Sequence, residues 1–195
     1  MLAKAVASLD VLSGGRFDLG IGVGWLEEEF DALGIPFGDR GARTDDYVAA
    51  MRALWSDDNT SHEGPFTSFA DVTTNPKPVN GSVPIVVGGH SKAAARRAGR
   101  LGDGFFPGRG SPAELAELID VVRQSAADAG RDPESVEITA PHAGLFGDDP
   151  VAAAEELAAI GVTRTIVPAF LLARGDVAEA AAGLAQKVLD PCAAI

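Results

Sequence analysis

The sequence predicts an α/β protein in which helices cover a parallel sheet. Short apolar segments alternate with longer amphipathic segments along most of the chain. The short segments are apolar at successive positions, as strands buried on both faces are. Glycines and capping residues separate the two kinds of segment. Strands that alternate with helices need right-handed crossovers, which place the helices on the faces of a parallel sheet.

The first part of the chain contains one predicted strand among helices. Leucine and valine side chains recur at helical spacing over residues 1–12, and glycines follow them. The segment FDLGIGVG predicts a buried strand over 17–23 that runs into glycines. Further helices are predicted over 25–34 and 45–56, the second opened by Thr44 or a neighbour.

Residues 57–82 are rich in Pro, Gly and Asn and interrupt this alternation. The segment GPFTSFADVTT within them predicts a small hairpin. We therefore expect an insertion segment over 57–82 within a single domain that covers residues 1–195.

The alternation resumes at residue 84. Ser111 and Glu114 form a predicted capping box with proline at the first helical position, so a helix begins there and runs to about residue 129. The other predicted helices are 91–101, 149–161 and 176–189. The predicted strands of this part are 84–87, 103–107, 136–140 and 163–169.

The five predicted strands are preceded by a helix that has no strand before it. A closed (β/α)8 TIM barrel needs about 250 residues, and the chain has 195. Five βα units with an unmatched first helix correspond to the later part of such a barrel, with the first three units missing. An open five-stranded sheet is the alternative.

Composition excludes several classes of function. The formal net charge is −12, whereas nucleic acids and anionic membranes are bound through clustered positive charge. No apolar run approaches the ~20 residues that cross a bilayer. The single cysteine, Cys192, cannot form an internal disulfide, which fits a cytoplasmic protein. His62 and His142 have no partner at metal-ligand spacing, so we expect no metal site.

Two glycines, Gly88 and Gly89, follow the predicted strand 84–87. Ligands of α/β folds bind at the carboxyl ends of strands, and the N-terminus of the next helix favours an anion such as phosphate. His90 and Ser91 lie beside this position. A tight turn that needs glycine only for a positive φ explains the same pair, so the local pattern leaves both interpretations open.

Two further strand ends carry candidate residues. Glycines in GIGVGW (20–25) indicate that another backbone or a flat ligand packs against the strand. Gly104 also permits close approach, and one of Phe105 and Phe106 could wall a ring-shaped ligand while the other lies in the core. Arg109 is either an anion contact or a solvated loop arginine.

Several segments together, in order, resemble the luciferase-like monooxygenase family. They are LDVLSGGRFDLGIGVGWLEEEFDALGIPF, R-x-x-R-T-D-D-Y, W-S-D, and Pro-Lys-Pro before PIVVGGHSKAAARRAGRLGDGFFP. The chain is most similar to the branch that uses the 8-hydroxy-5-deazaflavin coenzyme F420. The resemblance covers nearly the whole chain. It implies a barrel with an insertion segment, and an oxidoreductase that acts on paired donors or transfers hydride between cofactor and a small organic substrate. We expect a homodimer.

The resemblance also implies a cofactor site, in which the glycine pair binds the cofactor phosphate through backbone amides. The segment at Gly104 and Phe105 approaches the same phosphate, and the strand end from Gly22 to Trp25 lies near the ring. The expected cofactor is F420, with FMN as the alternative, and no catalytic residue is assigned. The expected cofactor-binding residues are Gly22, Gly24, Trp25, Val87, Gly88, Gly89, His90, Ser91, Gly104 and Phe105.

The sequence departs from the family pattern at two points. Sugar-phosphate dehydrogenases of the family carry Glu where this chain has Trp25, which argues against that substrate. The chain also opens in the helix expected after the third strand of the barrel. A catalytically inactive cofactor-binding or structural fragment is therefore an alternative function. An unrelated phosphate-binding barrel, such as an isomerase or aldolase, is another, although no strand end offers an obvious catalytic Lys or Glu.

Overall fold

The computed structural model describes residues 1–166, 168 and 175–193. The chain divides into two compact units. Unit 1 comprises Met1–Val87 and Leu101–Asp103, and unit 2 comprises Gly88–Arg100 and Gly104–Ile195.

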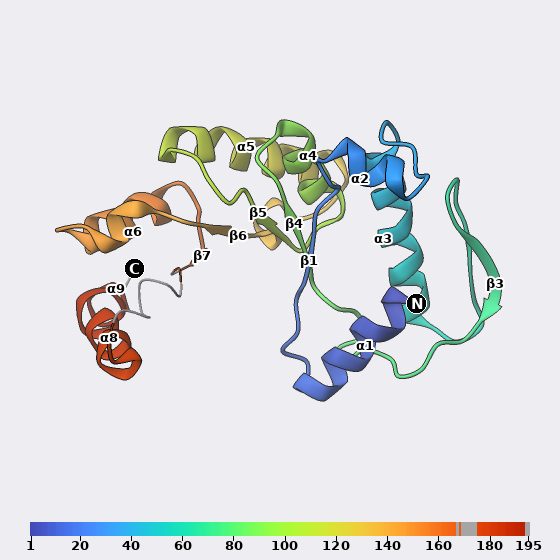
Figure 1. Cartoon of the computed structure of the whole chain (residues 1–195), viewed down its shortest axis with the longest axis horizontal. Coiled ribbons are helices and arrows are strands. Elements are labelled where there is room, and N and C mark those ends of the chain that lie inside the picture. The colour runs from blue at the N-terminus through green and yellow to red at the C-terminus, as the bar shows by residue number, and fades with distance from the viewer. Residues whose placement is uncertain (167, 169–174, 194–195) are drawn as a thin grey trace. The chain divides into compact units, whose positions relative to one another are not determined.

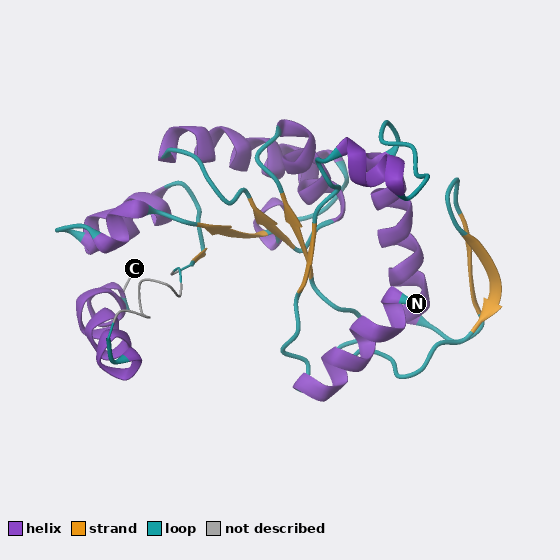
Figure 2. Ribbon diagram, viewed as in Figure 1, coloured by secondary structure: helices purple, strands orange, loops and turns teal. Residues whose placement is uncertain are grey.

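Unit 1 combines helices, two strands of parallel sheet and a separate hairpin (Figure 1). Its strands β1 and β4 are parallel, and Leu19 lies opposite Ile85 in their register. The antiparallel hairpin β2–β3 stands apart from that pair (Figure 2). The elements are α1 (Leu2–Ser13), β1 (Leu19–Ile21), α2 (Glu27–Ala32), α3 (Arg40–Ser56), β2 (Thr60–Glu63), β3 (Ser68–Val72) and β4 (Ile85–Gly88), the last residue of which belongs to unit 2.

The core of unit 1 forms where α1 and α3 pack on the β1–β4 pair. Trp55 is the largest buried side chain and is 1% exposed. Its indole Nε1 donates to the Ala3 carbonyl oxygen at 2.9 Å, so its polar group is satisfied inside the core. Val6 and Ala7 of α1 and Ile85 of β4 belong to the same cluster. The helix itself was predicted correctly, but its buried face was not. Leu2, Leu9 and Leu12 are exposed, and Val6 is buried together with Ala3, Ala7 and Asp10.

Helix α3 begins at Arg40, five residues before the predicted start at residue 45. The prediction treated Thr44 as a capping residue. Instead, the Thr44 hydroxyl donates to the Arg40 carbonyl oxygen at 2.8 Å, inside the helix. The (i, i+4) pair of Asp39 and Arg43, 3.2 Å apart, supports the extra first turn.

The described residues of unit 2 include three parallel strands and their connecting helices (Figure 1). Gly104 pairs with Glu137 between β5 and β6, and Thr139 pairs with Arg164 between β6 and β7. The elements are α4 (Lys92–Leu101, its last residue in unit 1), β5 (Gly104–Phe106), α5 (Pro112–Asp128), the 3₁₀ turn η1 (Pro133–Ser135), β6 (Glu137–Ala140), the 3₁₀ turn η2 (Ala143–Phe146), α6 (Pro150–Ala159), β7 (Arg164–Thr165), α8 (Val177–Leu184), the π-helical turn η3 (Ala185–Leu189) and α9 (Asp190–Cys192).

The core of unit 2 is built largely from one face of α5. Leu115, Ile119 and Val122 of this helix are at most 1% exposed. The predicted capping box at its start is confirmed, because the Ser111 hydroxyl accepts from the Glu114 N–H and the Glu114 carboxylate accepts from the Ser111 N–H. Sequence and structure therefore agree closely on where this helix begins.

The last predicted elements differ more from the structure. The predicted strand 163–169 is observed as a strand only over Arg164–Thr165, and its residues 167 and 169 lie outside the described part. The predicted closing helix contains the π-helical turn η3, which sequence periodicity did not reveal.

The predicted fold class is confirmed as an α/β fold with parallel strands and helices. Within residues 1–166, 168 and 175–193, no helix combines the length and apolar character needed to span a membrane. The same residues contain no group of three or more His, Cys, Asp and Glu side chains arranged to hold a metal ion.

Candidate functional site

The turn after β4 has no room for a side chain at Gly89. Gly89 has a φ of 138°, which L residues rarely adopt, and an added Cβ would lie 2.8 Å from the Cβ of Ala94. Its N–H donates to the Phe106 carbonyl oxygen at 3.1 Å. This N–H is thus already used within the fold, and a ligand here would meet the next N–H groups along the chain.

Those next N–H groups belong to the capped first turn of α4. The Ala94 N–H donates to the Ser91 hydroxyl at 3.2 Å, and the Ala95 N–H donates to the Ser91 carbonyl oxygen at 3.0 Å. The other N–H groups of a first turn have no acceptor within the helix. Residues 90–93 are exposed. Open donors and the positive end of the helix dipole together suit an anion.

His90 and Arg109 line one cavity beside this turn, with a volume of about 340 Å³. They follow β4 and β5 respectively, so two strand ends supply them. Gly108 has a φ of 72°, which favours glycine, and an added Cβ there would also lie 3.2 Å from the His90 ring. Hydrogen bonds from the N–H and hydroxyl of Ser111, with a smaller effect of Arg109, hold the pKa of Glu114 below its usual range.

The residues predicted to approach the cofactor at the start of β5 are more buried than expected. Gly104 is buried, and the Phe105 side chain is 0% exposed. Phe105 is therefore the core member of the phenylalanine pair, and its side chain offers no surface to a ligand. Phe106 is only partly buried. The predicted approach of this segment to a cofactor is thus restricted to its backbone.

The predicted site residues of unit 1 lie at the end of β1 and on β4. Gly22 has open space around an added Cβ, whereas a Cβ at Gly24 would lie 2.7 Å from the Phe30 ring. Trp25 is 82% exposed, so most of its side chain lies open to solvent, and Val87 is buried. The remaining predicted residues belong to unit 2, where the structure groups them around the start of α4 and β5.

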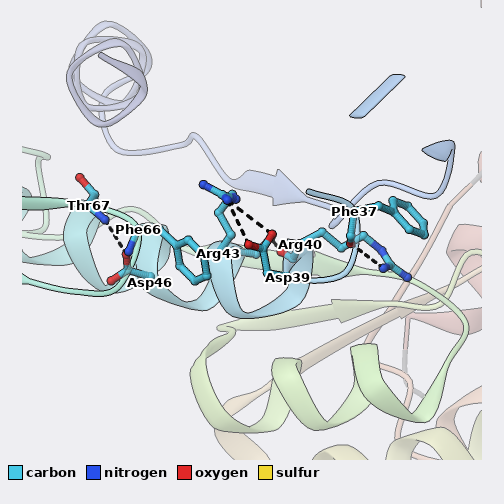
Figure 3. Close-up of polar contacts among 8 residues, drawn as sticks. Phe37, Asp39, Arg40, Arg43, Asp46, Phe66 and Thr67 are labelled. Atoms are coloured by element: carbon cyan, nitrogen blue, oxygen red, sulfur yellow. Dashed lines mark hydrogen bonds and ion pairs between the residues drawn. The ribbon is translucent and has the colours of Figure 1, made fainter. Parts of the chain in front are cut away.

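A buried carboxylate, Asp46 of α3, holds the turn of the β2–β3 hairpin (Figure 3). It accepts from His62 Nε2 at 2.7 Å and from the N–H groups of Phe66 and Thr67, each at 2.9 Å. Burial opposes ionisation of this side chain, but the hydrogen bonds from His62, Phe66 and Thr67 outweigh it and lower the pKa of Asp46. A carboxylate with three donors in place is a structural clamp rather than a catalytic base.

Two arginines at the start of α3 form a cationic group that sequence reasoning did not single out (Figure 3). The Arg40 guanidinium lies 3.7 Å above the Phe37 ring and donates to the Phe37 carbonyl oxygen at 2.9 Å. The Arg43 guanidinium lies 4.4 Å above the Phe66 ring and pairs with Asp39. The R-x-x-R spacing between the predicted helices 25–34 and 45–56 was the available signal.

Comparison with known proteins assigns the chain to a family. Residues 1–188 match the family model described as luciferase-like monooxygenase. The chain belongs to the luciferase-like monooxygenase family. The FMNH(2)-dependent dimethylsulfone monooxygenase of Pseudomonas putida is 34% identical over 134 residues, which are 67% of this chain and 37% of that protein. The chain spans less than half the length of the curated relatives it matches.

Solved structures of luciferase-like proteins share the fold. An F420-dependent secondary alcohol dehydrogenase in complex with an F420–acetone adduct matches 72% of this chain and 43% of its own, with 26% identity and a TM-score of 0.65. The coenzyme F420 dependent tetrahydromethanopterin reductase from Methanopyrus kandleri matches 97% of this chain and 78% of its own, with a TM-score of 0.74. Its identity is 17%, so this second match shows the fold alone.

Proposed function

We propose that this luciferase-like chain binds the phosphate of FMN or of the deazaflavin coenzyme F420 at the start of α4. The protein that contains it is then an oxidoreductase acting on a small organic substrate. The observation that carries the proposal is the Gly89 turn followed by the capped, exposed first turn of α4. A Cβ would fill the turn, and the open N–H groups suit a phosphate.

The residues present fit such a cofactor. Ser91 and the first-turn N–H groups would hold the phosphate, and His90 and Arg109 add side chains able to carry positive charge at the neighbouring cavity. When bound, FMN or F420 supplies the redox chemistry, while the protein supplies position and electrostatics. Trp25 and Gly22 remain proposed neighbours of the ring.

The comparisons support both cofactors. One relative is named as FMNH(2)-dependent, and one structural neighbour holds an F420 adduct. The two cofactors share a phosphate and a tricyclic ring, so one phosphate site serves either. The sequence resemblance favours F420. Monooxygenation with reduced flavin and hydride transfer with the deazaflavin are the two corresponding activities, and a cytoplasmic homodimer remains part of the proposal.

The test measures the contribution of the phosphate to binding separately from that of the ring. FMN and riboflavin differ only in the phosphate, so isothermal titration of the chain with each measures the phosphate contribution. Ser91→Asp keeps a good N-cap but adds a negative charge, whereas Ser91→Asn keeps the cap without charge. We expect Ser91→Asp to weaken FMN binding at least about tenfold through repulsion. Riboflavin binding should change little, and Ser91→Asn should bind FMN like the original chain.

The same titration with F420 and its phosphate-free form decides between the two cofactors. Tighter binding of one phosphate-bearing molecule identifies the cofactor. Equal affinity for the phosphate-bearing and phosphate-free forms of both, or FMN binding untouched by Ser91→Asp, would overturn the proposed phosphate site. No binding of any of them by the folded chain would overturn the cofactor-binding function of this chain.

A further inference from the structure

A second and larger cavity lies in unit 2, away from the start of α4. Its volume is about 790 Å³, within the range of small-molecule sites. One wall comes from η2 and the start of α6, and the other comes from α8 and the π-helical turn η3. The loop containing η2 directly follows β6, at the carboxyl end of that strand. This is the end at which α/β enzymes bind their substrates.

The walls of this cavity are mainly apolar. Leu145 and Val188 line it and are themselves buried, at 3% and 7% exposed. Pro150 and Leu184 also line it, and Phe146, 40% exposed, adds an aromatic side chain. Apolar surface of this kind favours an apolar ligand body, because binding removes both surfaces from water.

Among the described residues of the lining, the ionisable side chains are Asp148 and Lys187. Asp148 lies just before α6, where the positive end of the helix dipole accommodates its charge. Lys187 lies within the continuous helical run from Val177 to Cys192, away from either end. Among the described residues, the structure records no acidic partner for Lys187. Its ammonium group is therefore the charge available to a ligand.

Two local features suit a binding role for these walls. Lys187 and Val188 lie in the π-helical turn η3, and such turns often occur at functional sites. The opposite wall is held in place by His142, whose Nδ1 accepts from the Gly144 N–H at 2.9 Å. The other ring nitrogen, Nε2, lies 3.4 Å from the Glu156 carboxylate of α6. The loop that forms this wall is thus fastened to α6 before any ligand arrives.

We propose that this cavity binds an organic acid, with its apolar body against Leu145, Leu184 and Val188 and its anionic group at Lys187. As a substrate site, it rests on the proposed function and names the substrate class of that oxidoreductase. As a binding site, it depends only on the cavity and its charge.

The binding test uses two fluorescent probes of similar size. The probe 8-anilinonaphthalene-1-sulfonate carries one sulfonate, and N-phenyl-1-naphthylamine is its uncharged counterpart. Both emit strongly when they leave water for an apolar site. We expect the cofactor-free chain to bind both saturably and the sulfonate more tightly.

Three variants locate the binding. Lys187→Gln should weaken the sulfonate probe roughly three- to fivefold, as for an exposed ion pair, and leave the uncharged probe unchanged. Lys4→Gln is the matched control at an exposed position of α1 in unit 1 and should change neither. Gly183→Phe fills the cavity from α8, where an added Cβ meets nothing within 4 Å, and should weaken both probes. Circular dichroism of each variant verifies its fold.

The outcomes of this assay test the cavity independently of the proposed cofactor site. Equal sulfonate binding by the original chain and Lys187→Gln would overturn the anionic-group assignment. Probe binding that survives Gly183→Phe would overturn the cavity itself. Because the assay contains no flavin, a failure of the proposed cofactor function would leave these results unchanged. Conversely, flavin binding with no probe binding would overturn this inference and leave the proposed function in place.

Discussion

The α3–hairpin junction of unit 1 and the start of α4 in unit 2 use polar groups in opposite ways. At the junction, Asp46 receives three hydrogen bonds and its side chain is only 4% exposed. At the start of α4, Ser91 caps one N–H, while residues 90–93 remain exposed. In the first region the polar groups are hydrogen-bonded within the protein. In the second, backbone N–H groups of the first turn remain open to solvent or a ligand.

The difference separates structural from binding roles. Removing one member of a buried, fully hydrogen-bonded cluster leaves the other members without hydrogen-bond partners. Such a cluster therefore affects stability strongly. An exposed first turn loses little stability when it changes, because water replaces the missing partner. A His–carboxylate pair in sequence therefore says little about catalysis until burial and the remaining hydrogen bonds are known.

The largest expected effect tests this division directly. Asp46→Ala leaves His62 and two backbone N–H groups without their acceptor, and we expect a loss of about 3 kcal/mol in the free energy of unfolding. Ser91→Ala removes one exposed cap and should cost about 1 kcal/mol. Urea denaturation of both variants measures the two values. Similar losses would show that the two regions do not differ as the structure indicates.

A smaller effect distinguishes two glycines that each follow a strand. Gly89→Ala places a Cβ at a φ of 138° and against Ala94, and we expect it to cost about 2 kcal/mol. Gly22→Ala enters open space and should change the free energy of unfolding by less than about 0.5 kcal/mol. Thermal and urea unfolding of both variants give the comparison. A destabilised Gly22→Ala and a tolerated Gly89→Ala would reverse the assignment of the tight turn.

The smallest expected effect is a dependence on pH. The pKa of Asp46 is lowered in the folded chain, so its ionised form contributes stability above the unfolded value of about 3.9. That contribution is lost as the pH falls through the lowered folded pKa. The stability difference between the original chain and Asp46→Asn should therefore shrink as the pH falls below about 4. A difference that stayed constant to pH 2 would contradict this role of Asp46.

Much of the fold could be predicted because its signals are local. The capping box at Ser111 and the helical spacing over residues 1–12 involve residues within a few positions of one another, and the two helices they predict are confirmed. The start of α3 was predicted wrongly because a threonine side chain can cap a helix or bond within it. Sequence alone does not distinguish these two uses of Thr44.

Less of the candidate site could be predicted, because its side chains meet across the chain. His90 and Arg109 were identified separately, but their shared cavity depends on how two strand ends come together. Asp46 and His62 are 16 residues apart, and nothing local predicts their contact. Nothing in the local sequence indicates a binding role for Lys187, and only the structure places it in the wall of a cavity.

The sequence by itself determined the alternation of strands and helices, the family, and the glycine turn before α4. These follow from periodicity, capping and steric freedom, which act over neighbouring residues. Only the tertiary structure decided which polar groups are buried and satisfied and which remain open. That outcome depends on packing between distant segments, and it separates the clamp at Asp46 from the exposed donors at the start of α4.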